Sequence, residues 1–112
     1  MLKKIKRILY RSIDNKEISY DVLKKLTKDN EVVLIDVRSN QEYEEGHLNG
    51  AINLSVYNIK NKIENLVKDK EKIIILYCSS GNRSKKAKEI LENLGYNNVY
   101  NLKKGIDNLW IK

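Results

Sequence analysis

The stretch that decides the fold reads Ile73-Ile74-Ile75-Leu76-Tyr77-Cys78-Ser79-Ser80-Gly81-Asn82-Arg83-Ser84. Its apolar first half predicts a buried strand, and its polar second half predicts a tight loop. A helical pattern follows, with apolar residues on one face at Ala87, Ile90, Leu91 and Leu94. A strand, a glycine-containing loop and a helix start together form an arrangement whose backbone N–H groups bind anions. A cysteine at the mouth of such a loop ionises readily, so we expect Cys78 to be a nucleophile rather than an inert buried thiol.

The rest of the chain alternates in the same way. Further strands are predicted around Ile18 and at Val32–Val37, Ala51–Leu54 and Asn98–Leu102. Helices are predicted over Tyr20–Leu26, from a capping box at Ser39 to Gly46, from an N-cap at Ser55 to Val67, and from the loop to Gly95. This order predicts an α/β fold: a single domain with a mainly parallel five-stranded sheet flanked by helices. Ligands of such sheets bind beyond the carboxyl ends of the strands, where Cys78 stands.

Composition narrows the functional classes. The chain has 112 residues, one cysteine and one histidine, which excludes an intrachain disulfide and leaves no Cys or His cluster for a metal. A free thiol without a partner fits a reducing compartment, so we expect a cytoplasmic protein. The net charge of +7 is not accompanied by a cluster of basic and aromatic residues of the kind that binds nucleic acid. A small anionic substrate or an acidic partner is therefore favoured over nucleic acid.

Residues 1–15 differ from the rest of the chain. They place an apolar stripe among basic residues at helical spacing, which predicts a basic amphipathic N-terminal helix ahead of a domain at 16–112. We expect the stripe to pack on the domain. Contact of residues 1–13 with a membrane surface is the less favoured alternative.

Three motifs resemble the signatures of rhodanese-like domains. The first runs from Leu34-Ile35-Asp36-Val37-Arg38 through Glu42-Tyr43 to Gly46-His47-Leu48-Asn49-Gly50-Ala51-Ile52-Asn53-Leu54. Tyr77–Ser84 resembles the active-site loop, and Gly105-Ile106 with Trp110 resembles the C-terminal signature. Asn49 replaces the usual proline and Lys104 the usual second glycine, which affects local turn geometry rather than chemistry.

The resemblance implies a sulfurtransferase that needs neither metal nor cofactor. Cys78 would take sulfane sulfur from a small anionic donor such as thiosulfate and hold it as a persulfide. An external thiol or cyanide would then accept the sulfur, because the chain has no second cysteine. The substrate-binding residues implied by the motif are Ser79, Ser80, Gly81, Asn82, Arg83 and Ser84.

Two other functions compete with this interpretation. A rhodanese-like module could bind a partner or sense sulfur without turnover, although the intact Cys78 argues against an inactive module. Cysteine phosphatases and arsenate reductases have five residues between their cysteine and arginine, whereas four separate Cys78 from Arg83. The shorter loop suits a sulfur atom better than a tetrahedral oxyanion.

Other polar residues near these motifs are expected to have the following roles. We expect Asp36 to be a structural carboxylate rather than a base, and Arg38 to pair with Glu42 rather than face substrate. Arg83 remains open between binding an anion and pairing with a carboxylate. Ser79 and Ser80 are either hydrogen-bond donors to substrate or small residues that let the loop curl. His47, in a connecting loop, is not expected to act as a catalytic partner of Cys78.

Overall fold

The computed structural model describes residues 16–110, so the expected N-terminal helix at 1–15 lies outside the described residues. The elements alternate between strand and helix along the chain. They are β1 (Glu17–Ile18), α2 (Tyr20–Asp29), β2 (Val32–Asp36), α3 (Asn40–Glu45), β3 (Ile52–Asn53), α4 (Ile59–Leu66), β4 (Ile73–Tyr77), α5 (Asn82–Asn93), β5 (Val99–Leu102) and α6 (Asp107–Trp110). Within the described range, no helix is both long and apolar enough to cross a membrane.

The five strands form one sheet in the order β1-β5-β4-β2-β3, and each of its strand pairs is parallel. The central strands β2 and β4 pair along their full length, from Val32 opposite Ile73 to Asp36 opposite Tyr77. Both strands are rich in branched apolar residues, as expected for strands covered on both faces. The predicted α/β architecture is therefore confirmed.

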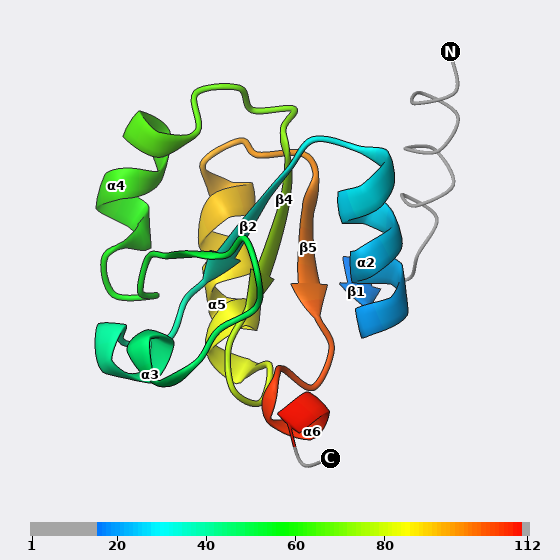
Figure 1. Ribbon diagram of the computed structural model, residues 1–112. Helices are drawn as coiled ribbons and strands as arrows, with labels where there is room; N and C mark the ends of the chain where they lie inside the picture. The colour runs from blue at the N-terminus through cyan, green and yellow to red at the C-terminus, as the bar shows by residue number, and fades with distance from the viewer. Residues whose placement is uncertain (1–15, 111–112) are drawn as a thin grey trace.

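Helices cover both faces of the sheet (Figure 1). One face carries α4 and α5, which bury Ile63 and Leu91 against Ile74 and Leu76. The other face carries α2, which buries Leu26 in a second cluster with Ile75 and Tyr77. Because side chains alternate along a strand, Cys78 continues the parity of Ile74 and Leu76 and falls on the α5 side.

Two local predictions differ from the structure. The helix predicted to begin at Ser55 begins at Ile59, with Asn58 as its N-cap and no side-chain cap bond. Ser55 instead closes a turn, since its carbonyl accepts the N–H groups of Asn58 and Ile59. The strand predicted at Ala51–Leu54 is limited to the two residues of β3 at the sheet edge. The capping box at Ser39 is confirmed, with both of its reciprocal hydrogen bonds to Glu42 present.

Candidate active site

Cys78 follows the last residue of β4 at the carboxyl edge of the sheet. Its side chain is 1% exposed and packs in the core cluster under α5. The chain turns back at Gly81, which has a φ of 101° and serves as the N-cap of α5. Because Gly81 has no side chain, no side-chain cap competes for the first N–H groups of α5.

Hydrogen-bond donors surround the sulfur atom of Cys78. The N–H of Gly81 donates to Sγ at 3.1 Å and the N–H of Ser84 at 3.4 Å. The Ser84 hydroxyl lies 3.3 Å from Sγ and 3.2 Å from the Gly81 carbonyl oxygen, so its proton has two neighbouring acceptors. Ser84 is itself fully buried, which keeps water away from these bonds.

These contacts favour the thiolate form of Cys78. Burial is the largest single influence and raises the pKa of the thiol. The hydrogen bonds from the Ser84 hydroxyl and from the N–H groups of Ser84, Gly81 and Ser80 act in the opposite direction, and together they hold the pKa below its usual value. Cys78 therefore combines shielding from solvent with a stabilised negative charge.

A segment after β5 holds the loop from behind. The N–H of Ile106 donates to the Cys78 carbonyl oxygen at 3.0 Å, and the N–H of Asp107 donates to that of Ser79 at 3.1 Å. Gly105 has a φ of 66°, and a Cβ at this position would lie 2.2 Å from the Ser79 carbonyl oxygen. Gly105 belongs to the C-terminal motif, but its part in the site was not predicted from the sequence. The motif was its only signal, because the contact spans distant parts of the chain.

The structure pairs Arg83 with a carboxylate. Its Nη1 lies 2.7 Å from Glu42 Oε1 and its Nη2 lies 3.0 Å from Glu42 Oε2, which is a two-pronged ion pair. Ser79 joins the pair, because its hydroxyl donates to Glu42 at 3.3 Å and accepts from Arg83 at 3.2 Å. The Arg83 guanidinium holds the pKa of Glu42 well below its usual range. Of the two alternatives left open for Arg83, the structure therefore contains the carboxylate pair.

The partner expected for Arg38 was wrong. The Arg38 guanidinium forms its ion pair with Asp36, with Nη2 2.7 Å from Oδ2, and also donates to the Gly46 carbonyl oxygen at 2.6 Å. Asp36 is fully buried and accepts the backbone N–H of Arg38 at 2.9 Å. The two buried charges at the end of β2 are thus paired with each other. Glu42 was the wrong choice because α3 presents it to the cysteine loop instead.

The remaining candidates lie at the edge of this arrangement. Ser80 and Asn82 are exposed on the loop. His47 is exposed, stacks on the Tyr43 ring with centroids 3.8 Å apart, and places Nδ1 2.9 Å from the Tyr43 carbonyl oxygen. Across residues 16–110 there is no group of three or more His, Cys, Asp or Glu side chains that could hold a metal ion.

Both departures from the motifs fall in turns. The Leu48 carbonyl oxygen accepts the Ala51 N–H at 3.0 Å, and Gly50 supplies a φ of 83°, so the turn closes without a proline at Asn49. Lys104 has a φ of 68°, in the left-handed region that glycine adopts without strain. The lysine therefore occupies a glycine conformation directly before Gly105.

A family model described as "Rhodanese-like domain" matches residues 19–112. The thiosulfate sulfurtransferase PspE of Escherichia coli K12 is 42% identical over 67 residues, which are 60% of this chain and 64% of PspE. The tRNA uridine(34) hydroxylase of Erwinia tasmaniensis is 35% identical over 82 residues, which are 70% of this chain and 23% of that protein.

The solved structures include one described as a rhodanese with anions from E. coli. It is 38% identical, has a TM-score of 0.64, and the match covers 68% of this chain and 89% of that one. The chain thus spans most of a solved rhodanese. It spans less than two thirds of the two curated relatives, and under a quarter of the hydroxylase.

Proposed function

This chain belongs to the rhodanese-like family, and from that premise we propose that it is a sulfurtransferase that works through a persulfide on Cys78. The donor is a small sulfur anion such as thiosulfate, and the acceptor is an external thiol or cyanide. The observation that carries the proposal is the set of N–H donors around Sγ, with Gly81 at 3.1 Å and Ser84 at 3.4 Å. Such donors stabilise a sulfur anion without a general base.

In the first half-reaction, the Cys78 thiolate attacks the outer sulfur of thiosulfate. A new S–S bond forms to Sγ, the S–S bond of the donor breaks, and sulfite leaves with the electron pair. The negative charge then rests on the terminal persulfide sulfur. The uncapped N–H groups at the start of α5 lie beyond Gly81 and are suited to hold that charge.

In the second half-reaction, the acceptor attacks the terminal sulfur. The bond to Sγ breaks, and Cys78 leaves as the thiolate from which the cycle began. The acceptor comes from outside the chain, because Cys78 is its single cysteine. No step requires a metal or cofactor. We assign Cys78 as the nucleophile and residues 79–84 as the binding loop, with Arg83 held by Glu42 rather than free.

The proposal extends to organisation and surroundings. We assign sulfur transfer to residues 16–112 and treat residues 1–15 as a separate basic segment that the chemistry does not use. A reducing compartment keeps a single cysteine as a free thiol, so we propose a cytoplasmic location. We also propose that Asp36 and Arg38, which form an ion pair at the end of the neighbouring strand, support the site rather than bind substrate.

A second candidate is a rhodanese-like module that carries or senses sulfur without turnover. It is supported by the hydroxylase relatives, in which the matched region is about a quarter of a larger protein. Hydrolysis of phosphate esters is disfavoured, because the loop has four residues between Cys78 and Arg83.

Mass spectrometry after incubation with thiosulfate tests these functions. We expect the protein to gain the mass of one sulfur, to lose it on addition of cyanide with release of thiocyanate, and to repeat the cycle. Cys78→Ser should gain no sulfur and release no thiocyanate, and no other cysteine can confuse the assignment. Sulfur uptake without turnover would favour the sulfur-carrying module, and no uptake at all would refute the sulfurtransferase.

A further inference from the structure

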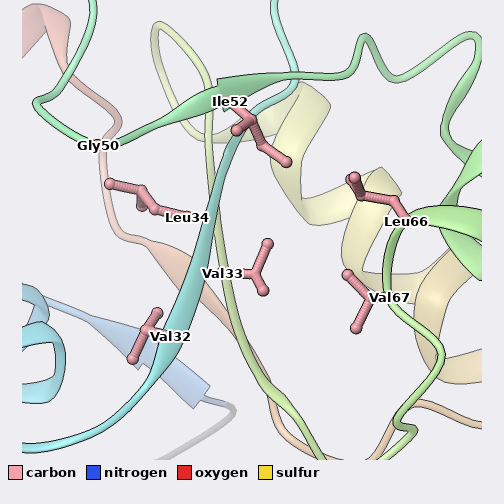
Figure 2. A pocket seen from close by; sticks show the side chains of 7 residues that line it. All are labelled: Val32, Val33, Leu34, Gly50, Ile52, Leu66 and Val67. Atoms are coloured by element: carbon pink, nitrogen blue, oxygen red, sulfur yellow. The ribbon is translucent and has the colours of Figure 1, made fainter.

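The hollow between β2, β3 and α4 and the cysteine loop differ in their charge. The hollow is apolar, with Val33, Ile52 and Leu66 facing into it, and none of its lining residues is charged (Figure 2). At the cysteine loop, by contrast, Arg83 and Glu42 form an ion pair, and their side chains are 35% and 33% exposed. Charges that select a substrate are therefore found at the loop.

The ion pair leaves the cysteine loop without a net charge. The groups that donate to Cys78 Sγ are the neutral N–H of Gly81 and the neutral N–H and hydroxyl of Ser84. Arg83 is the one charged residue in the loop sequence 78–84. Glu42 accepts from both Nη atoms of Arg83, at 2.7 and 3.0 Å, so its negative charge cancels that of the guanidinium.

The pair also lies next to the reactive cysteine. Ser79 directly follows Cys78, and its hydroxyl accepts from Arg83 Nη2 at 3.2 Å and donates to Glu42 Oε2 at 3.3 Å. The hydrogen bond with Glu42 raises the pKa of Arg83, and the negative charge of Cys78 raises it further. Arg83 is thus within electrostatic reach of the sulfur, and a change in its neutralisation changes the field at Cys78.

Three lysines lie on another side of the loop, around a polar hollow that Ser80 and Gly81 also line. They are Lys85, Lys103 and Lys104, and all three are exposed. Water and salt therefore screen their charges. The ion pair is about two thirds covered, so the charges of its two members are screened less.

We propose that Glu42 sets the charge of the sulfur donor: because it engages Arg83, the site takes donors with one negative charge, such as alkyl thiosulfonates, ahead of dianions such as thiosulfate. The inference rests on the sulfur transfer proposed above and narrows its donor. A second negative charge on the donor would approach the Cys78 thiolate without a free cation to offset the repulsion. Glu42 does not contact the reacting sulfur, so it is a positioning residue that acts through Arg83.

The transfer from a thiosulfonate is balanced in the same way as that from thiosulfate. The Cys78 thiolate attacks the outer sulfur, and an S–S bond to Sγ forms. The S–S bond of the donor breaks, and an alkyl sulfinate leaves with the electron pair. The persulfide and the sulfinate each carry one negative charge, as the thiolate and the donor did before.

Two matched alkylating reagents test the charge that Cys78 accepts. Iodoacetate carries one negative charge, and iodoacetamide has nearly the same size and none. Both react with the Cys78 thiolate, so a change in its pKa or its accessibility cancels in the ratio of the two rates. Glu42→Gln should raise the ratio of the iodoacetate rate to the iodoacetamide rate about three- to fivefold, as expected for one partly screened charge, and added salt should shrink the gain. Glutamine still completes the capping box with Ser39, so α3 keeps its start.

Further variants assign the effect to the pair. Arg83→Gln leaves the Glu42 carboxylate without its cation and should lower the ratio by a similar factor. The double variant removes both charges and should return the ratio close to that of the unmodified protein. The matched control is Glu44→Gln, which removes an exposed carboxylate from the same helix, two residues from Glu42 and on another face. An unchanged ratio in Glu42→Gln, or an equal rise in Glu44→Gln, would overturn the proposal.

Sulfur uptake tests the donor itself. Methanethiosulfonate carries one negative charge and thiosulfate two, and uptake by Cys78 from each is followed by mass spectrometry. The unmodified protein should take sulfur faster from methanethiosulfonate. Glu42→Gln should narrow this difference about three- to fivefold, through a lower KM for thiosulfate rather than a higher kcat, because the freed Arg83 binds the second charge. A faster uptake from thiosulfate in the unmodified protein, or a difference that Glu42→Gln leaves unchanged, would refute the assignment.

The two assays separate failure of this inference from failure of sulfur transfer. If Cys78 takes up sulfur but Glu42→Gln changes neither the alkylation ratio nor the donor preference, sulfur transfer stands and the role of Glu42 fails. If Cys78 takes up no sulfur from either donor but the alkylation ratio shifts, Glu42 still sets the charge accepted at Cys78, and the sulfurtransferase fails.

Discussion

Replacement of Gly105 by alanine tests whether the segment after β5 holds the cysteine loop in place. The added Cβ would lie 2.2 Å from the Ser79 carbonyl oxygen and 2.5 Å from that of Cys78. Both oxygens belong to backbone, which cannot rotate away as a long side chain would. The loop and the segment must therefore separate, and the bonds from the Ile106 and Asp107 N–H groups to these oxygens must lengthen or break.

The expected cost has two parts. Alanine at a φ of 66° costs about 1–2 kcal/mol because its Cβ crowds the backbone. Loss of two loop hydrogen bonds adds about 1 kcal/mol for each. We therefore expect Gly105→Ala to lower the free energy of unfolding by about 3–4 kcal/mol. In a domain of this size, each kcal/mol lowers the Tm by about 4–8 °C.

Gly50→Ala is the matched control. Gly50 has a φ of 83°, and a Cβ there would have nothing within 4 Å. Gly50→Ala should therefore lower the free energy of unfolding by the conformational term alone, about 1–2 kcal/mol. It should leave the reactivity of Cys78 unchanged. Thermal unfolding and the rate of Cys78 alkylation by iodoacetamide are measured for both variants. Equal losses of stability, with equal alkylation rates in the two variants, would refute the idea that Gly105 holds the loop.

Three further perturbations follow from the site. Ser84→Ala should raise the pKa of Cys78 toward its ordinary value, because one of the hydrogen bonds that favour the thiolate is lost. The rate of alkylation measured against pH should then shift to higher pH. An unshifted profile would mean that the backbone N–H groups alone lower the pKa of Cys78. Glu42→Gln should lower the free energy of unfolding by about 1 kcal/mol at pH 7. Because the pKa of Glu42 is depressed in the folded protein, its carboxylate stabilises the fold above the ordinary pKa of about 4.3, and this stability is lost as the pH falls below that value. The variant should therefore lose less stability on acidification than the unmodified protein, and an equal loss would contradict this. Lys104→Gly should raise the Tm by a few degrees through relief of its φ of 68°, whereas Lys103→Gly, at an ordinary φ, should lower it.

Much of the fold was predictable because its signals are local. The apolar run that ends at Tyr77 and the capping box at Ser39 gave β4 and the start of α3 directly. The position of Cys78 at a strand end followed from the same run. The helix start at Ser55 was misjudged, because a serine before an apolar pattern also closes turns, and only the packing of Ile59 decides between the two.

The partners of charged side chains were harder to predict. Arg38 has two nearby carboxylates in the sequence, Asp36 and Glu42, and the pattern does not say which one it meets. The choice depends on how α3 lies relative to the cysteine loop in the folded chain, where Glu42 meets Arg83 across 41 residues.

The pairing of β1 with β5 has a consequence for the order in which the protein matures. Glu17 and Asn101 are 84 residues apart, and β1 joins the edge of the sheet at this pair. Contacts between distant residues form slowly, because the chain must first lose the entropy of a long loop. The segment that holds the Cys78 and Ser79 carbonyls lies beyond β5. During synthesis, a ribosome that has released Cys78 has therefore not yet released the residues that shape its surroundings. We expect the cysteine of a nascent chain to be an ordinary thiol, and to acquire its reactivity only when residues 105–107 are free to fold.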